Sequence, residues 1–200
     1  MPSEDNLAIT NAAALLMRLE TMGVDVGERW HSVADVAAGR VGEVVRPFNT
    51  LHFVMAAVGA GRLNLARDHV QAMRAWAADP ANVNRTVRPI LERLALPVAE
   101  GTIAWGEGDW ERCLECMLPV RREWVPLGGS WAQRDVWERM CLEAALRAGR
   151  FPLARSLVGA RTVEKPASAP TWRAYARALS GVGDMSRAAD AVARAEALAA

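Results

Sequence analysis

Apolar residues recur at steps of three and four along most of the chain, the spacing that places them on one face of an α-helix. The pattern is clearest in four segments that begin just after residues 61, 108, 149 and 183. Alternating β-branched runs, which would indicate strands, are nearly absent, and the helix formers alanine, leucine, arginine and glutamate are abundant. These observations predict an all-α fold.

A short motif marks the start of each of these segments. It consists of a glycine, a charged residue and a large apolar residue, in the tripeptides Gly61-Arg62-Leu63, Gly108-Asp109-Trp110, Gly149-Arg150-Phe151 and Gly183-Asp184-Met185. Five positions after each glycine stands a small residue, Ala66, Cys113, Ala154 or Ala188. A left-handed glycine ends one helix, and Asp109 and Asp184 are suited to cap the next. We expect the large residue to dock on the preceding helix and the small one to let two backbones approach. The motif predicts an antiparallel helical hairpin that repeats four times.

A fifth hairpin is predicted at the start of the chain, with helices over about 7–22 and 28–38 separated by Gly23 to Gly27. Gly149 and Gly183 lie 34 residues apart, which is the period of a tetratricopeptide repeat. We therefore predict that residues 1–200 form a single tetratricopeptide-like helical repeat domain. Its architecture would be an α-solenoid of about five antiparallel helical hairpins, each in contact only with its neighbours. A non-repetitive helical bundle is the alternative.

Composition and charge narrow the possible partners. Hydrophobic residues make up 52% of the chain and charged residues 24%, as in ordinary globular proteins, which excludes a disordered chain. The net charge of +1 gives no strong attraction to nucleic acid or anionic lipid, so neither is an expected partner. The N-terminal sequence MPSEDN lacks the basic and apolar regions of a secretory leader, and the odd set of three cysteines suits a reducing compartment. We therefore expect a cytoplasmic protein.

Four segments of the chain resemble one known family. They are LLMRLETMGVDVGERW (15–30), PFNTLHFVMAAVGAGR (47–62), LPVAEGTIAWGEGDWERCLECMLPVR (96–121) and GGSWAQRDVWERMCLEAALRAGR (128–150). Together they resemble the C-terminal half of the tetratricopeptide-repeat protein 38 family, whose members are about twice as long. The resemblance implies an all-α repeat fold and no settled biochemical activity. Family members tend to carry an acid where this chain has Thr50, and histidine or asparagine where it has Trp131. If the polar residues of the family form an active site, this chain has lost part of it. If they only cap helices, the two differences have little effect on the protein.

The segment from Ser130 to Asp135 is one candidate binding site. Ser130 and Gln133 have the spacing of a capping box, in which each side chain bonds the other residue's backbone N–H. On the functional hypothesis, Trp131, Arg134 and Asp135 lie at the mouth of a groove, where Arg134 grips a carboxylate or phosphate with two parallel hydrogen bonds. On the structural alternative, the segment is only a well-made helix start, and Asp135 pairs with Arg139 one turn later.

His52 is the second candidate. It follows Asn49, which is a plausible N-cap of the helix that contains it. Histidine titrates near neutral pH, so His52 is suited to contact a ligand or to act as a general base. The alternative is a hydrogen-bonded core histidine.

Cys113 and Cys116 form a CxxC pair without a second ligand pair at zinc-site spacing, so we interpret them as structural. We predict that the protein binds no metal ion and no cofactor, and we assign no catalytic residue.

The sequence favours a non-catalytic interaction scaffold that binds a peptide or protein partner in a concave groove. Its eight tryptophans suit such a face, because tryptophan buries a large area at small entropic cost. The alternative is a small-molecule-binding protein or acid–base enzyme, with His52, Arg134 and Asp135 in a pocket enclosed by the solenoid. Self-association through the first hairpin is a secondary expectation, since that hairpin carries Leu7, Leu15, Leu16 and Leu19.

Overall fold

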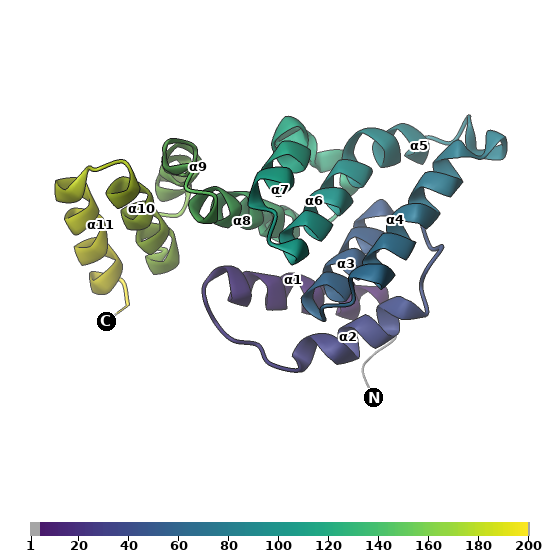
Figure 1. The fold of residues 1–200 in the computed structure, drawn as a ribbon, viewed down its shortest axis with the longest axis horizontal. Helices are drawn as coiled ribbons and strands as arrows, with labels where there is room; N and C mark the ends of the chain where they lie inside the picture. Colours follow the sequence, from purple (N-terminus) through teal and green to yellow (C-terminus); the bar gives the residue numbers. More distant parts are fainter. Residues whose placement is uncertain (1–4, 200) are drawn as a thin grey trace. The chain divides into compact units, whose positions relative to one another are not determined.

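The computed structural model describes residues 5–199, and within that range every regular element is a helix (Figure 1). The all-α prediction is therefore confirmed. The prediction that MPSEDN is not a secretory leader falls largely on residues 1–4, which lie outside the described residues. None of the helices that the structure describes is long and apolar enough to cross a bilayer.

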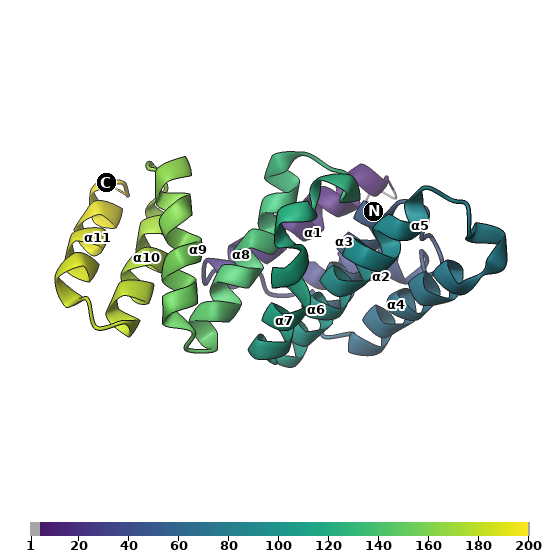
Figure 2. The same cartoon turned by 90° about the horizontal axis from the view of Figure 1, so that it is seen from above.

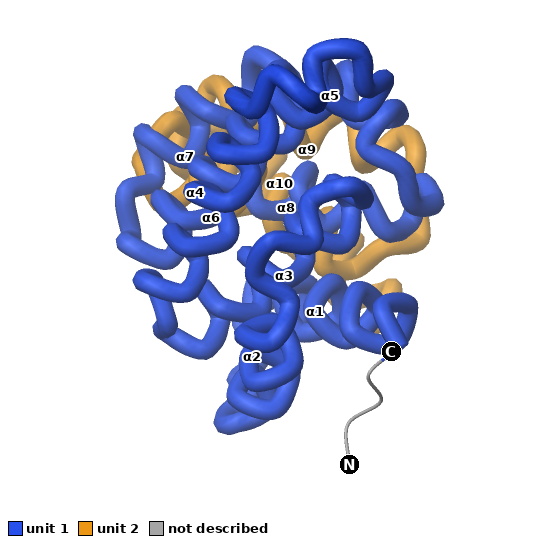
Figure 3. The backbone as a smooth tube through the Cα atoms, turned by 90° about the vertical axis from the view of Figure 1, so that its right-hand side faces the viewer, with its two compact units in different colours: residues 1–141 blue, residues 142–200 orange. Residues whose placement is uncertain are grey.

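The chain divides into two compact units, residues 1–141 and residues 142–200, which Figure 3 colours separately. The first unit contains α1 (Asn6–Thr21), α2 (Arg29–Ala38), α3 (Pro47–Gly59), α4 (Leu63–Ala78), α5 (Val87–Ile90), the π-helix η2 (Leu91–Ala95), α6 (Leu96–Glu107) and α7 (Trp110–Met117). Three short 3-10 helices lie between them or after them, η1 (Pro80–Asn82), η3 (Leu118–Glu123) and η4 (Val125–Leu127). The boundary between the units falls inside α8 (Trp131–Arg147). The second unit continues with α9 (Phe151–Glu164), α10 (Ala169–Gly181) and α11 (Met185–Ala197). That the whole chain is one domain stays a prediction.

Consecutive helices pack in pairs, as Figures 1 and 2 show. In the first unit α1 packs against α2, α3 against α4, and α6 against α7. The first helices of these pairs also pack against one another, α1 against α3 and α3 against α6. In the second unit α10 packs against both α9 and α11. Because α3 has neighbours on several sides, its residues from Thr50 to Val58 are all buried.

The predicted turns are confirmed. All four motif glycines, Gly61, Gly108, Gly149 and Gly183, have φ between +69° and +81°. The Asp109 side chain accepts a hydrogen bond from the backbone N–H of Arg112 at 3.0 Å, and Asp184 accepts one from Arg187 at 3.3 Å. The small residues Ala66, Cys113, Ala154 and Ala188 are at most 4% exposed. The motif therefore does end one helix and begin the next, as its sequence indicates.

One local prediction is wrong. Asn49 is not an N-cap, because α3 begins at Pro47 and its N-cap position is Arg46. Proline is well placed at the first helical position, since its φ is already helical and the backbone N–H that it lacks would have no helical partner there. The helix therefore starts three residues earlier than the polar side chain of Asn49 suggests.

Three glycines near the ends of helices lie against large apolar side chains, a contact that was not predicted from the sequence. A Cβ atom built on Gly59 of α3 would lie 2.2 Å from Cε2 of Trp30, which comes from α2. A Cβ atom on Gly106 of α6 would meet Val58 of α3 at 2.6 Å and Leu63 of α4 at 3.0 Å. Gly181 of α10 would meet Phe151 of α9 at 2.1 Å. In each case the large side chain stands at the start of the second helix of a pair. The glycine stands near the end of the first helix of the next pair.

We expect this contact to be sensitive to a single methyl group. Gly181→Ala places a Cβ inside the ring of Phe151, so the free energy of unfolding should fall by about 2–3 kcal/mol from overpacking. The matched control is Gly159→Ala in α9, where no atom lies within 4 Å of the added methyl. That control should raise stability by up to about 1 kcal/mol through helix propensity. Urea denaturation of both variants measures the difference, and equal stabilities would contradict the account.

Candidate functional site

His52 lies in the second turn of α3 and is fully buried. Its Nδ1 is 2.7 Å from the carbonyl oxygen of Phe48. Because a carbonyl only accepts, Nδ1 carries the proton and Nε2 keeps a lone pair. Nε2 is buried without a hydrogen-bond partner among the described residues. Burial lowers the pKa of His52 from 6.5 to about 4, with the nearby Arg18 charge a smaller cause and the bond to Phe48 opposing it. The imidazole is therefore neutral at physiological pH.

Aromatic rings enclose this imidazole. The ring centroid of Phe48 lies 4.3 Å from that of His52, and the ring of Trp137 lies 5.7 Å away. Trp124 packs edge-on against Trp137 at 5.8 Å. The indole nitrogens of Trp124 and Trp137 are also buried and have no partner in the part of the chain described. These surroundings support the interpretation of His52 as a core histidine.

Arg134 holds the turn that covers this cluster. Its Nη1 donates to the carbonyl oxygen of Gly128 at 3.0 Å and also to that of Gly129. Gly129 has a φ of +71°, and a Cβ atom there would lie 2.2 Å from Cε2 of Phe48. The guanidinium that was a candidate to bind an anion therefore bonds two backbone carbonyls, and the turn beneath it lies directly on Phe48.

The capping box next to Arg134 is confirmed. The backbone N–H of Gln133 donates to Oγ of Ser130 at 3.2 Å, and the backbone N–H of Ser130 donates to Oε1 of Gln133 at 2.8 Å. The Gln133 amide also donates to Oδ1 of Asn11 at 3.1 Å, and Arg18 donates to the carbonyl of Ala132. These two bonds hold the first turn of α8 against α1.

The other two predicted site residues have separate surroundings. Asp135 is 6% exposed, and its Oδ2 accepts from Nε of Arg139 at 3.0 Å, as in the structural alternative. Trp131 is 57% exposed. Among the four predicted residues, His52 and Arg134 contact the same aromatic cluster through Phe48 and Gly129. The polar groups of His52, Arg134 and Asp135 each bond a different partner, which does not favour shared acid–base chemistry.

A groove along α4, α6 and the start of α7 was not predicted. It encloses about 430 Å³ and is lined by Arg67, Asp68, Val70, Gln71, Arg74, Glu100, Ile103, Ala104, Glu107 and Arg112. Its floor is apolar and its rim carries both signs of charge. The rim residues were missed because the helical pattern identifies them only as a solvated face. Their convergence depends on the packing of α4 against α6, which no sequence motif encodes.

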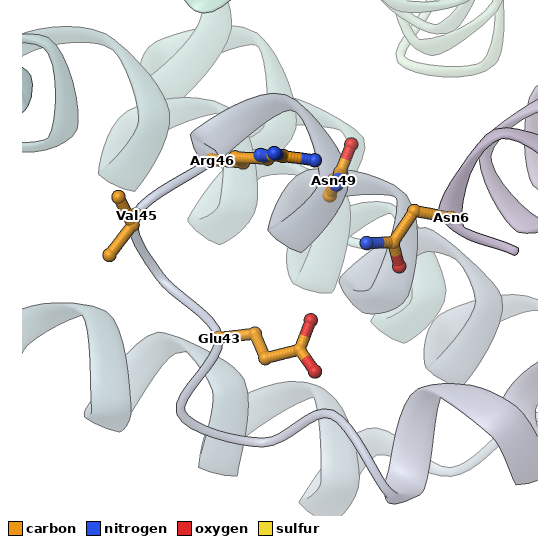
Figure 4. Close-up of a pocket in the computed structure, with 5 residues that line it drawn as sticks. All are labelled: Asn6, Glu43, Val45, Arg46 and Asn49. Atoms are coloured by element: carbon orange, nitrogen blue, oxygen red, sulfur yellow. The ribbon is translucent and has the colours of Figure 1, made fainter.

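A second hollow lies between the N-terminal ends of α1 and α3 (Figure 4). It encloses about 230 Å³ and is lined by Asn6, Glu43, Val45, Arg46 and Asn49. Of these, only Asn49 was considered from the sequence, and only as a helix cap. The five residues come from three separate segments, so spacing along the chain gives no signal for them.

The cysteines show no sign of chemical activation. Cys113, Cys116 and Cys141 are free thiols and buried. Burial raises the pKa of Cys113 to about 12, raises that of Cys116, and raises that of Cys141 well above its usual value. Such thiols are poor nucleophiles. Over residues 5–199, no cluster of three histidine, cysteine, aspartate or glutamate side chains is suited to hold a metal ion. The burial and the raised pKa values of Cys113 and Cys116 agree with the structural interpretation of the CxxC pair.

No family model matches the chain, and no solved structure matches it. The resemblance to the tetratricopeptide-repeat protein 38 family therefore stays a prediction.

The lowered pKa of His52 predicts a loss of stability in acid. The unfolded chain takes up a proton near pH 6.5, whereas the folded chain resists protonation until about pH 4. The contribution of His52 is thus present above pH 6.5 and is lost as the pH falls through this window, by about 2 kcal/mol at pH 5. Denaturation at pH 7 and pH 5 should show a smaller loss for His52→Leu than for the wild type. His69, whose pKa burial also lowers, is present in both proteins and cancels. An NMR titration midpoint of His52 near 6.5 would refute this prediction.

Proposed function

We propose that the chain is a non-catalytic interaction module of tetratricopeptide-like hairpins, related to the C-terminal half of the tetratricopeptide-repeat protein 38 family. It binds a peptide or protein segment along the groove lined by α4, α6 and the start of α7. The single observation that supports this binding site most directly is the groove itself, which combines an apolar floor with a rim of exposed ion pairs.

The rim consists of charges that can exchange partners. Arg67 pairs with Glu107 at 2.5 Å, and Arg74 pairs with Glu100 at 2.6 Å. Arg112 lies 3.8 Å from the other carboxylate oxygen of Glu100. The arginine side chains are 50–55% exposed, so each pair contributes little to folding stability. A partner with both signs of charge can replace these pairs without a large cost.

The floor gives such a partner an apolar contact. Val70 projects from α4, while Ile103 and Ala104 belong to α6. An apolar centre surrounded by a polar rim is the usual anatomy of a protein interface. The groove therefore suits an extended or helical segment with apolar residues in its middle and mixed charges at its edges.

The surroundings of the predicted acid–base residues support a non-catalytic role. His52 is neutral and enclosed by aromatic rings, and Asp135 is paired with Arg139. Arg134 bonds two backbone carbonyls. A general base must reach the proton of a substrate, and none of these three residues lines the groove.

Reversal of charge in the groove should weaken binding. Peptides selected from a random display library against the purified protein would be titrated by fluorescence anisotropy. The double variant Arg67→Glu/Arg74→Glu should bind them about tenfold more weakly or worse, because like charges then face Glu100 and Glu107. The matched control is Arg93→Glu, which breaks an exposed pair with Glu123 outside the groove and should leave affinity unchanged. Equal affinities of the wild type and the double variant would exclude this groove as the binding site.

Self-association through the first hairpin forms the second part of the proposal. Leu7 and Leu15 of α1 are 59% and 55% exposed, and Met22, which directly follows the helix, is 40% exposed. Leu16, by contrast, is 6% exposed and belongs to the core of the chain. We expect light scattering to detect a concentration-dependent dimer that Leu15→Glu abolishes. A monomer at all concentrations would remove this part of the proposal and leave the groove unaffected.

A further inference from the structure

The hollow between α1 and α3 has walls that are held in place by the fold. Asn6 is the first residue of α1, Glu43 and Arg46 belong to the segment before α3, and Asn49 is in the first turn of α3. Val44 anchors this segment with an exposed fraction of 1%, and Oγ1 of Thr50 donates to the backbone carbonyl of Glu43 at 2.6 Å. The Glu43 carboxylate is itself held by Arg40 at 2.8 Å. The backbone of this segment and the Glu43 carboxylate are therefore positioned before any ligand arrives.

Several of these groups have unused hydrogen-bonding capacity. Oδ1 of Asn6 is buried and has no hydrogen-bond partner in the described part of the chain. The structure gives no bond from the Arg46 guanidinium or the Asn49 carboxamide to another described side chain. Because this oxygen is buried, a ligand in the hollow does not reach it, and only the amide nitrogen of Asn6, which Figure 4 shows directed into the space, is placed to donate to a ligand. The hollow thus offers the Arg46 guanidinium and two carboxamides to an incoming molecule.

The charges of the hollow lie on opposite sides. In Figure 4 the Glu43 carboxylate extends into the space on one side of Asn6, and the guanidinium of Arg46 lies with Asn49 on the other side. An anion alone would meet the Glu43 carboxylate, and a cation alone would meet the Arg46 guanidinium. A ligand that carries both charges pairs with both residues. The volume of about 230 Å³ limits it to a molecule smaller than a typical drug-sized ligand.

We infer that this hollow binds a small zwitterion of the α-amino acid class. Its carboxylate pairs with Arg46 and its ammonium with Glu43, and the carboxamides of Asn6 and Asn49 complete the hydrogen bonds. Val45, which is 66% exposed, offers its methyl groups to the ligand's side chain. The inference goes beyond the proposed function and is independent of it, because no residue of the hollow lines the α4–α6 groove.

Titration calorimetry of the full chain with the twenty free L-amino acids tests the inference. We expect at least one of them to bind with a dissociation constant of about 1 mM or tighter. Its N-acetyl derivative, which lacks the ammonium, and its amide, which lacks the carboxylate, should each bind about tenfold more weakly or worse. Absence of binding by all twenty at about 10 mM overturns the inference. Binding of dipeptides in place of amino acids also overturns it, because a dipeptide separates the two charges by a further residue.

Two variants identify the residues responsible. Arg46→Gln should remove the preference for the acid over its amide, and Glu43→Gln should remove the preference for the free amine over its N-acetyl form. Arg93→Gln, an exposed arginine outside the hollow, is the matched control and should leave both preferences unchanged. Circular dichroism and the thermal midpoint verify that each variant is folded. If folded Arg46→Gln and Glu43→Gln proteins keep the wild-type preferences, the ligand binds elsewhere and the inference is wrong.

Discussion

The arrangement of the hairpins depends on one repeated contact, in which a large side chain lies directly on a glycine of the following helix. Trp30 lies on Gly59, Leu63 on Gly106 and Phe151 on Gly181. An added methyl group would lie 2.2 Å from Trp30 at Gly59 and 2.1 Å from Phe151 at Gly181, distances that only a residue without a Cβ permits. At Gly106 it would lie 2.6 Å from Val58 and 3.0 Å from Leu63. Protein interiors are too closely packed to absorb such an overlap without cost. In these three pairs the contact therefore limits how closely the two helices approach each other.

This close approach has consequences for both candidate binding sites. Leu63 on Gly106 places the start of α4 against the end of α6, which are the two helices that line the groove. Trp30 on Gly59 places α2 against α3, and the segment that joins these helices carries Glu43 and Arg46 into the hollow. The groove is thus a space between two helices that meet at a glycine, and the hollow lies beside the segment that joins two such helices.

Features that depend on a few neighbouring residues could be predicted from the sequence. The left-handed turn glycines, the caps Asp109 and Asp184, and the capping box of Ser130 and Gln133 all follow from local backbone geometry. The start of α3 was mispredicted because Pro47 and Asn49 both carry a start signal, and the proline prevailed.

Features that depend on which helices meet could not be predicted. Nothing near Gly59 in the sequence indicates that Trp30 lies against it, and nothing near His52 indicates that Trp137 encloses it. The hollow brings Asn6 next to Asn49, which belong to different hairpins. The sequence offered His52 as a ligand contact or general base, with a core histidine as the alternative. Its neutral state and its enclosure are properties of tertiary packing.

A double-mutant cycle between Trp30 and Gly59 tests the central claim most directly. The account predicts that Gly59→Ala costs about 2 kcal/mol or more in the wild type, because the methyl overlaps the indole ring. In a Trp30→Ala background the same substitution should cost much less, so the coupling energy should exceed about 1 kcal/mol. Additive effects within about 0.5 kcal/mol would mean that the two residues do not interact and would contradict the account.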